Sequence, residues 1–547
     1  MEEINTEWLP HLSNEIVANA HGNLLDAYVV ALEGWRRGLT LKWHAKDHEK
    51  FKDMSTWFVD RPGQLFSLSS NEKTHYFFRT RGDKVTNEAV EIGKDKDKTK
   101  LALKQAGVPV PEGKQFSAEI KNETIMEYAS DIGYPVVVKP TDGSFGRGVI
   151  SNITSQNELD YSLTYVRSEL NYPDIILEKY IPGDEYRLYV VESQVVGAIH
   201  RIPAHVVGDG VNSIKSLINS KNSDRSLNPR LISCPITLSK ETLEFIEKKG
   251  YTADAVPPKS ETVFLSDKSN ISLGGDPVDV LDEIPEAIKN VAVRAIQAVK
   301  GLNHGAVDLI RHTSHSSEEI GVVLELNPTA QLGGILFPIK GDSRDVPAAI
   351  IDYYFPETKM DAMQKPPVYF DLQEVLEPIA NNNAVSTQVK SLEKVSYYAQ
   401  RYKVSGAVHK LSYHHWMKTK ALSLSLIGYI AKLDDDNIEV VVAGPDKETL
   451  TQFKTHLMEP NQHAEVIGVE EEVWEEPLKI GFEIQGERKS ILQELNNKDN
   501  DLLEIKKAQK VWEKKYQNMI GSYSWQITRP LRALGGVVKR IKGNIHT

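Results

Sequence analysis

Hydrophobic positions change their spacing several times along this chain, and the middle part alternates between strand-like and helix-like runs. Three valines at residues 136–138 predict a buried strand. Residues 94–106 predict a helix that ends at Gly107 and Pro109. Because short turns separate strands and helices from there to about residue 356, we expect an α+β fold with several domains.

The flanking regions show other patterns. Residues 1–90 mix both spacings, with an amphipathic helix predicted over 16–32 and a short strand over 76–79, and we expect an N-terminal α/β region there. Residues 357–397 carry several prolines and three consecutive asparagines, which is typical of a linker. These boundaries leave 91–356 as the central domain.

Beyond the linker, residues 398–460 predict a compact unit of helices and strands, and 461–547 a helical, basic tail. Within the tail, residues 485–519 predict a charged helix, either solvated or a short coiled coil. At about 150 residues per domain, 547 residues allow three or four domains.

Charge and cysteine content narrow the class of protein. The formal net charge of −11 argues against nucleic acid as a partner. The single cysteine, Cys234, excludes an intrachain disulfide and indicates a reducing compartment. The acidic start lacks a signal-peptide core, and no apolar run approaches 18 residues. We therefore expect a cytoplasmic protein, with peripheral membrane contact left open.

Candidate chemistry begins directly after the valine run. Lys139 follows it and precedes a loop that contains Gly143, Ser144, Gly146 and Gly148. Glycines let backbone N–H groups approach an anion closely, and a lysine adds charge, as polyphosphate binding requires. An ordinary glycine-rich hairpin is the alternative for this segment alone.

Two apolar runs further along carry polar side chains that suit a metal. Residues 307–310 and 322–327 predict adjacent strands, with Asp308 on the first. Glu325 and Asn327 lie two positions apart on the second, so they share one face. Such an all-oxygen set suits Mg²⁺. A solvated acidic face is the alternative, but carboxylates in apolar strands need a counter-charge.

In their order along the chain, these motifs resemble the ATP-grasp superfamily, above all the ATP-grasp domains of cyanophycin synthetase and of the bifunctional glutathione synthetases. The resemblance covers about residues 90–356 and includes 95–96, the lysine and glycine loop, and the strand–turn–strand at 175–188. It implies that ATP and Mg²⁺ or Mn²⁺ join a carboxylate to an amine or thiol through an acyl phosphate.

The resemblance also implies a role for each matched residue. Lys96, Lys139 and the glycine loop contact the phosphates. Contacts to adenine and ribose are implied for Glu178, the backbone of Lys179 to Ile181, and Glu185. The metal is held by Asp308, Glu325 and Asn327. Arg187 and Arg201 bind the substrate carboxylate or the acyl phosphate, with surface salt bridges as the alternative.

Residues 398–460 resemble acylphosphatase, which implies a βαββαβ, ferredoxin-like fold. In that family a glycine-rich loop ends in an essential arginine, and an asparagine orients water. This chain places Lys410 at a loop glycine, His414 at the arginine and Lys432 at the asparagine. We therefore expect a folded module that does not hydrolyse acyl phosphates.

The C-terminal tail carries a further resemblance. Residues 523–532 are similar to a segment at the ends of bacterial glycosyltransferases of surface-polysaccharide clusters. The basic, amphipathic residues after it predict contact with a membrane surface or an acidic partner, such as a glycosyltransferase complex. A solvated terminus is the alternative.

The sequence thus favours an ATP- and Mg²⁺-dependent ligase that forms an amide in peptide or cell-surface polymer biosynthesis. Its expected partners are small-molecule or peptide substrates, and a homo-oligomer is compatible with it. Two alternatives remain from other classes: an acylphosphate hydrolase acting through the acylphosphatase-like domain, and a non-catalytic envelope-assembly module.

Overall fold

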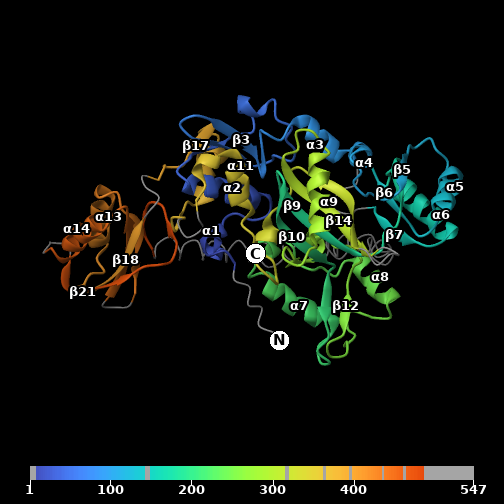
Figure 1. Ribbon diagram of the computed structural model, residues 1–547. Helices are drawn as coiled ribbons and strands as arrows, with labels where there is room; N and C mark the ends of the chain where they lie inside the picture. The colour runs from blue at the N-terminus through green and yellow to red at the C-terminus, as the bar shows by residue number, and fades with distance from the viewer. Residues whose placement is uncertain are drawn as a thin grey trace, which may run out of the picture. The chain divides into compact units, whose positions relative to one another are not determined.

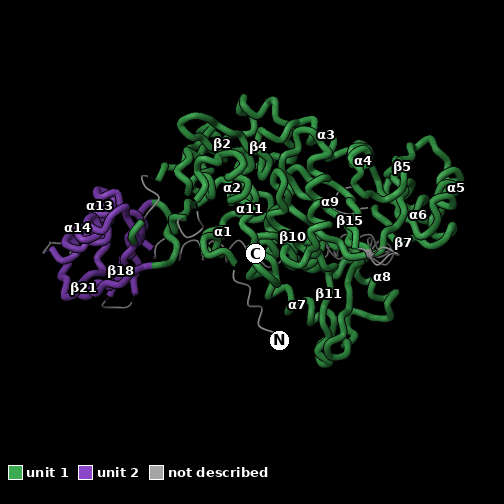
Figure 2. The backbone as a smooth tube through the Cα atoms, viewed as in Figure 1, with its two compact units in different colours: residues 1–398, 475–480 green, residues 399–474, 481–547 purple. Residues whose placement is uncertain are grey.

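The computed structural model describes residues 8–141, 148–313, 319–360, 365–392, 397–433, 437–459 and 464–485. The chain forms two compact units, residues 1–398 with 475–480 and residues 399–474 with 481–547 (Figure 2). The division at 398 coincides with the predicted start of the acylphosphatase-like domain. Among the described residues, no helix combines the length and the apolarity that crossing a bilayer requires.

The first unit begins with a five-stranded sheet in the order β17-β1-β2-β3-β4. Its strands are β1 (Thr40–His44), β2 (Leu65–Ser69), β3 (Thr74–Phe78), β4 (Arg81–Gly82) and β17 (Ser386–Gln388). Helix α2 (Asn23–Arg36) packs on β2, where Gly34 lies against Leu68. The strand predicted over 76–79 is therefore confirmed as β3.

Two expectations for this region are wrong in detail. The helix predicted over 16–32 is two helices, α1 (Asn14–Val17) and α2, because Gly22 takes a left-handed backbone conformation with φ +60°. The predicted linker, 357–397, carries α12 (Leu372–Ala380) and β17, which pairs with β1. The prolines of this region made it resemble a linker, but its strand β17 completes the N-terminal sheet.

A four-stranded sheet, in the order β5-β8-β6-β7, forms a separate layer of the first unit. Its members are β5 (Gly113–Phe116), β6 (Val136–Pro140), β7 (Ile150–Ile153) and β8 (Ile175–Lys179). Helices α5 (Asn122–Ile132) and α6 (Gln156–Thr164) pack on it through Ile125, Leu159 and Leu163 (Figure 1). The predicted strand at 136–138 is confirmed, and it ends just after Lys139.

Another core belongs to a five-stranded antiparallel sheet in the order β13-β10-β9-β14-β15. Its strands are β9 (Asp184–Val191), β10 (Gln194–Ile202), β13 (Asp276–Asp279), β14 (His304–Thr313) and β15 (Glu319–Asn327). Helix α9 (Glu286–Gln297) covers it with Ile288, Ala292 and Ile296. The adjacent strands predicted around Asp308 and Glu325 are confirmed as β14 and β15.

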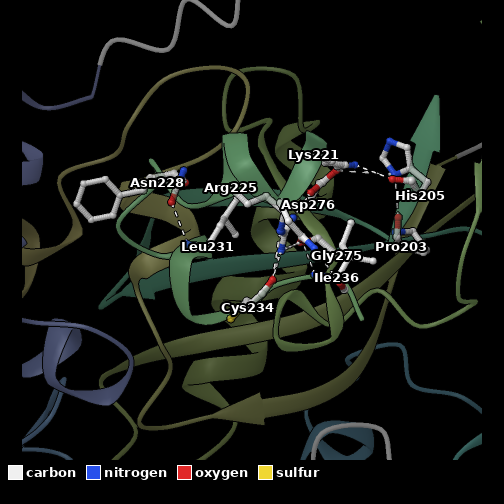
Figure 3. Close-up of polar contacts among 12 residues, drawn as sticks. Pro203, His205, Lys221, Arg225, Asn228, Leu231, Cys234, Ile236, Gly275 and Asp276 are labelled. Carbon is white, nitrogen blue, oxygen red and sulfur yellow. Dashed lines mark hydrogen bonds and ion pairs between the residues drawn. The ribbon is translucent and has the colours of Figure 1, made fainter. Parts of the chain in front are cut away.

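An insertion between β10 and β13 forms its own small core. It contains β11 (His205–Val207), α7 (Ile214–Arg225), α8 (Lys240–Lys248) and β12 (Thr262–Phe264). The Asp276 carboxylate on β13 accepts hydrogen bonds from the side chains of Lys221 and Arg225 on α7. The Arg225 Nη2 also donates to the Cys234 carbonyl over 2.7 Å (Figure 3). These buried ion pairs fasten the insertion to the sheet.

The second unit has the βαββαβ order predicted for it. The elements are β18 (Tyr398–Ala407), α13 (Leu411–Ser423), β19 (Ile427–Lys432), β20 (Asn437–Gly444), α14 (Lys447–Met458) and β21 (Glu465–Val473). The strand order is β21-β18-β20-β19, and β23 (Phe482–Ile484) extends the sheet in parallel beside β19.

The boundary at 460 is therefore wrong, because strands occupy part of the predicted helical tail. β21 is an edge strand with several exposed glutamates, so its sequence lacks the apolar alternation of a core strand. β22 (Leu478–Lys479) pairs with β16 (Val368–Tyr369) within the first unit. The helix predicted over 485–519 and the basic segment after it lie outside the described residues from 486 onward.

Gly428 offers a test of the second unit. A Cβ there would lie 1.9 Å from the Val441 carbonyl oxygen, and φ is +144°. We expect Gly428→Ala to destabilise this unit by about 2–3 kcal/mol, measured as faster hydrogen exchange in peptides from β19 and β20. Gly468→Ala is the control, since its Cβ would meet only the Ser405 hydroxyl at 3.2 Å. Equal exchange in both variants would contradict this packing.

Candidate nucleotide and metal site

Two lysines meet a buried carboxylate where β6 and β8 lie side by side. Glu178 pairs in register with Val137, and the residue is 6% exposed. The Lys139 Nζ lies 2.6 Å from the Glu178 Oε2, and the Lys100 Nζ contacts Oε1. Burial raises the pKa of Glu178, but the two ammonium groups outweigh it, and the pKa is lowered.

Lys100 was missed by the sequence reasoning, which selected Lys96 instead. Both lie on α4 (Lys96–Gln105), which Asp95 caps by accepting N–H groups of its first turn. Lys96 donates to the Thr141 carbonyl over 3.2 Å, whereas Lys100 reaches Glu178. Their spacing of four residues places both on one helix face, and this was the available signal.

The segment after β8 uses several of its polar groups inside the fold. The Lys179 Nζ donates to the Gly133 carbonyl over 2.9 Å, and its backbone N–H donates to the Glu112 carbonyl over 2.7 Å. The Tyr180 N–H donates to the Pro135 carbonyl over 3.0 Å. The half-buried Ile181 follows directly. Adenine contacts from this segment stay a prediction.

The glycine loop is described only at its end. Gly143, Ser144 and Gly146 lie outside the described residues. Gly148 has φ +74°, and a Cβ there would lie 2.7 Å from the Pro140 ring. The close return of the backbone onto the end of β6 therefore requires glycine at this position.

A second buried cluster crosses the five-stranded sheet. Arg187, Asp308 and Glu325 face one another in register on β9, β14 and β15. Arg187 holds Asp308 through two hydrogen bonds of 2.7 and 2.8 Å, and the Arg201 Nη2 adds a third of 3.0 Å. Burial alone would raise the pKa of Asp308, but the two guanidinium groups hold it well below its usual range.

Glu325 completes an oxygen-rich group beside Asp308. The Asn327 Nδ2 donates to the Glu325 Oε1 over 3.0 Å, which confirms that these two side chains share a face. Burial and then the negative charge of Asp308 raise the pKa of Glu325. A divalent cation between the two carboxylates would remove this repulsion, so the donor set fits Mg²⁺ or Mn²⁺.

Glu185 lies with the arginines. It contacts the Arg201 Nη2, and it accepts a hydrogen bond from the Ser269 hydroxyl. The loop before β13 thus reaches the same cluster. The ribose contact predicted for Glu185 would use the acceptor positions that these two partners leave open.

The second unit places its three diagnostic residues around the start of α13 and the end of β19. Lys410 precedes α13, and Lys432 ends β19. His414 is buried, and its Nε2 lies 3.1 Å from the Val408 carbonyl oxygen. The His414 ring therefore contacts the backbone of the segment that corresponds to the phosphate-binding loop of acylphosphatases.

Each of the two units contains a segment that matches a known protein family. Residues 95–213 match the family model of the carbamoyl-phosphate synthase L chain ATP binding domain. Residues 400–484 match the acylphosphatase model, which extends beyond the predicted boundary. The chain carries an ATP-grasp domain and an acylphosphatase-like domain.

Several longer proteins are similar to the first unit. Cyanophycin synthetase of Synechocystis sp. is 35% identical over 275 residues, which are 49% of this chain and 31% of that protein. The glutathione biosynthesis bifunctional protein GshAB of Desulfotalea psychrophila is 31% identical over 307 residues, 55% and 39% of the two chains. A bifunctional glutathione synthetase structure from Pasteurella multocida shares 28% identity over 54% of this chain and 41% of its own, with a TM-score of 0.41. The chain thus spans about a third of the length of the curated relatives it matches.

The pKa of Glu178 has a consequence for stability against pH. Because its pKa is lower in the folded chain, Glu178 stabilises the fold above the pKa of the unfolded chain, about 4.3, and this contribution is lost as pH falls through that range. We expect Glu178→Gln to lower stability at pH 7 by about 3 kcal/mol and to flatten the loss between pH 5 and 3 in denaturant titrations. Glu119→Gln, at an exposed position, is the control. An unchanged profile in Glu178→Gln would contradict the lysine pairing.

Proposed function

We propose that the first unit is an ATP- and Mg²⁺-dependent ligase that joins a carboxylate to an amine. The observation that carries this proposal is the convergence of Lys100 and Lys139 on the buried Glu178, at the strand end from which the glycine loop leaves. Two ammonium groups beside backbone amides are what a triphosphate needs. The domain match and the curated relatives support the same reading.

Lys100 and Lys139 would bind the phosphates, and Glu178 would orient both lysines. Phosphoryl transfer depends mainly on positioning and on neutralising charge. A carboxylate shared by two lysines fixes their ammonium groups before the nucleotide arrives, so less ordering is required on binding. Lys96, four residues earlier on the same helix, is the further phosphate ligand proposed.

Asp308, Glu325 and Asn327 would hold Mg²⁺ or Mn²⁺, which would neutralise the charge of the transferring phosphoryl group. Arg187 donates two hydrogen bonds to Asp308, so we propose that it positions this carboxylate. The buried Arg201 Nε has no hydrogen-bond partner among the described residues. Arg201 is therefore the better donor for a substrate carboxylate or an acyl phosphate.

The second unit is proposed to be non-catalytic. The unit matches the acylphosphatase model, but His414 stands where that family has its essential arginine, and its ring lies against a backbone carbonyl. The similar proteins are named for cyanophycin and glutathione, which are different products. We therefore propose for this chain only amide formation, in peptide or cell-surface polymer synthesis. Membrane or glycosyltransferase contact through the tail stays a prediction from the sequence.

Replacing either lysine tests the nucleotide site. Lys139→Ala and Lys100→Ala should each reduce substrate-dependent ADP release by roughly 10²–10³, because each removes a charge that stabilises the transferring phosphoryl group. Lys104→Ala, on an exposed position of the same helix, is the matched control. Full activity in Lys139→Ala would show that the site assignment is wrong.

A further inference from the structure

One border of the sheet in the second unit is open. β21 comes first in the order β21-β18-β20-β19-β23, and among the described residues it pairs with β18 alone (Figure 1). Every second backbone N–H and C=O group of such an edge strand points away from its one neighbour. The edge can therefore accept a further segment of chain.

Two large apolar side chains of β21 are exposed at this edge. Val466 and Val469 pack against the core of the unit, but Ile467 is 81% exposed and Val473 is 69% exposed. Ile467 lies where the register with β18 shifts. Native proteins usually protect an open edge from association, so exposed apolar residues there favour contact with another segment.

The other exposed side chains of β21 are acidic. The strand contains no lysine or arginine and four glutamates, Glu465, Glu470, Glu471 and Glu472. Lys454 and Arg401 pair with Glu471 and Glu472, whose side chains are still 47% and 59% exposed. Glu465 and Glu470 are exposed as well. A partner that complements this edge must therefore be basic and must also carry apolar residues.

The C-terminal tail of the same chain has this composition. Residues 529–542 contain no acidic residue and five basic ones, Arg529, Arg532, Lys539, Arg540 and Lys542. Apolar residues stand between them, namely Leu531, Leu534, Val537, Val538 and Ile541. This segment lies outside the described residues, and its charge and apolar content are the complement of β21.

The tail is attached close enough to reach the open edge. β23, the last described strand, lies at the opposite border of the same sheet, four strand spacings or about 19 Å from β21. The 44 residues 485–528 separate β23 from the tail, and a random coil of that length spans about 35 Å. This attachment gives the tail an effective concentration on the order of 1 mM at β21.

We propose that residues 529–542 bind along the open edge of β21, so that the basic tail docks on the acidic edge of its own second unit. Apolar residues of the tail cover Ile467 and Val473, and its basic residues pair with Glu465 and Glu470. Exposed ion pairs are individually weak, so the attachment of the tail to the same unit is what maintains the contact. The acidic partner that the sequence predicts for the tail is then part of the chain itself.

Hydrogen exchange of the full chain, followed by mass spectrometry, tests this contact. Peptides from β21 should exchange about tenfold faster in the triple variant Lys539→Glu/Arg540→Glu/Lys542→Glu, because the reversed charges release the tail from the edge. In the wild type, 1 M salt should also accelerate exchange, since it shortens the Debye length to about 3 Å. Peptides from β18 and β20 should be unchanged, which shows that the unit remains folded.

Two further variants assign the effect to the charges of β21. Glu465→Lys/Glu470→Lys should accelerate exchange in β21 as the tail variant does, and combining the two sets should restore slow exchange, because the charges are again complementary. Lys46→Glu/Lys50→Glu/Lys52→Glu makes the same change of charge at exposed positions of the first unit and should leave β21 unaffected.

Equal exchange of β21 in the wild type and the tail variant would overturn the proposal, and so would a combined variant that exchanges as fast as either set alone. The tail would then be left to a membrane surface or to solvent. Protection of β21 that disappears on dilution of the protein would also overturn it, because the tail of a second copy would then occupy the edge.

Discussion

The first unit depends on one buried carboxylate. Asp308 is 1% exposed on β14 of a five-stranded sheet, where an isolated charge would be prohibitively costly. Arg187 and Arg201, on the next two strands, supply its counter-charge. Because the ion pairs require β9, β10 and β14 in one register, the order of the sheet and the geometry of the site are fixed together.

The proposed site contains two charged groups, one that would bind a metal ion and one that would bind phosphates. Burial and the negative charge of Asp308 raise the pKa of Glu325, and a divalent cation between the two carboxylates would relieve this repulsion. At the other sheet, Glu178 sits between Lys100 and Lys139, and this group has a net positive charge that phosphates can use. In both places a buried carboxylate holds cationic side chains in position before any ligand binds.

Short-range patterns were enough to predict the elements that carry the site. The valines before Lys139 and the apolar runs around Asp308 and Glu325 predicted β6, β14 and β15, because a β-strand fixes side-chain direction locally. The βαββαβ order of the second unit was implied by its resemblance to acylphosphatase. The predicted boundary at 460 fell before its last strand, since the glutamates of an exposed edge strand do not show core alternation.

Contacts between distant segments could not be predicted in this way. Asp26 and Arg230 come from a helix and an insertion, and only the folded chain brings them to one loop after β15. Lys100 carried a helical-spacing signal, but its partner Glu178 lies 78 residues away. Spacing identifies the face on which a residue lies, and tertiary packing decides which charge it meets.

The central claim is that ATP activates a carboxylate as an acyl phosphate. The most direct measurement uses a substrate whose carboxylate carries ¹⁸O and follows the label by mass spectrometry during amide formation. Transfer of the γ-phosphoryl group to the carboxylate, followed by attack of the amine, leaves one labelled oxygen in the released phosphate. The account predicts singly labelled phosphate together with ADP and amide in equal amounts; amide formed with unlabelled phosphate, or with AMP, would contradict it.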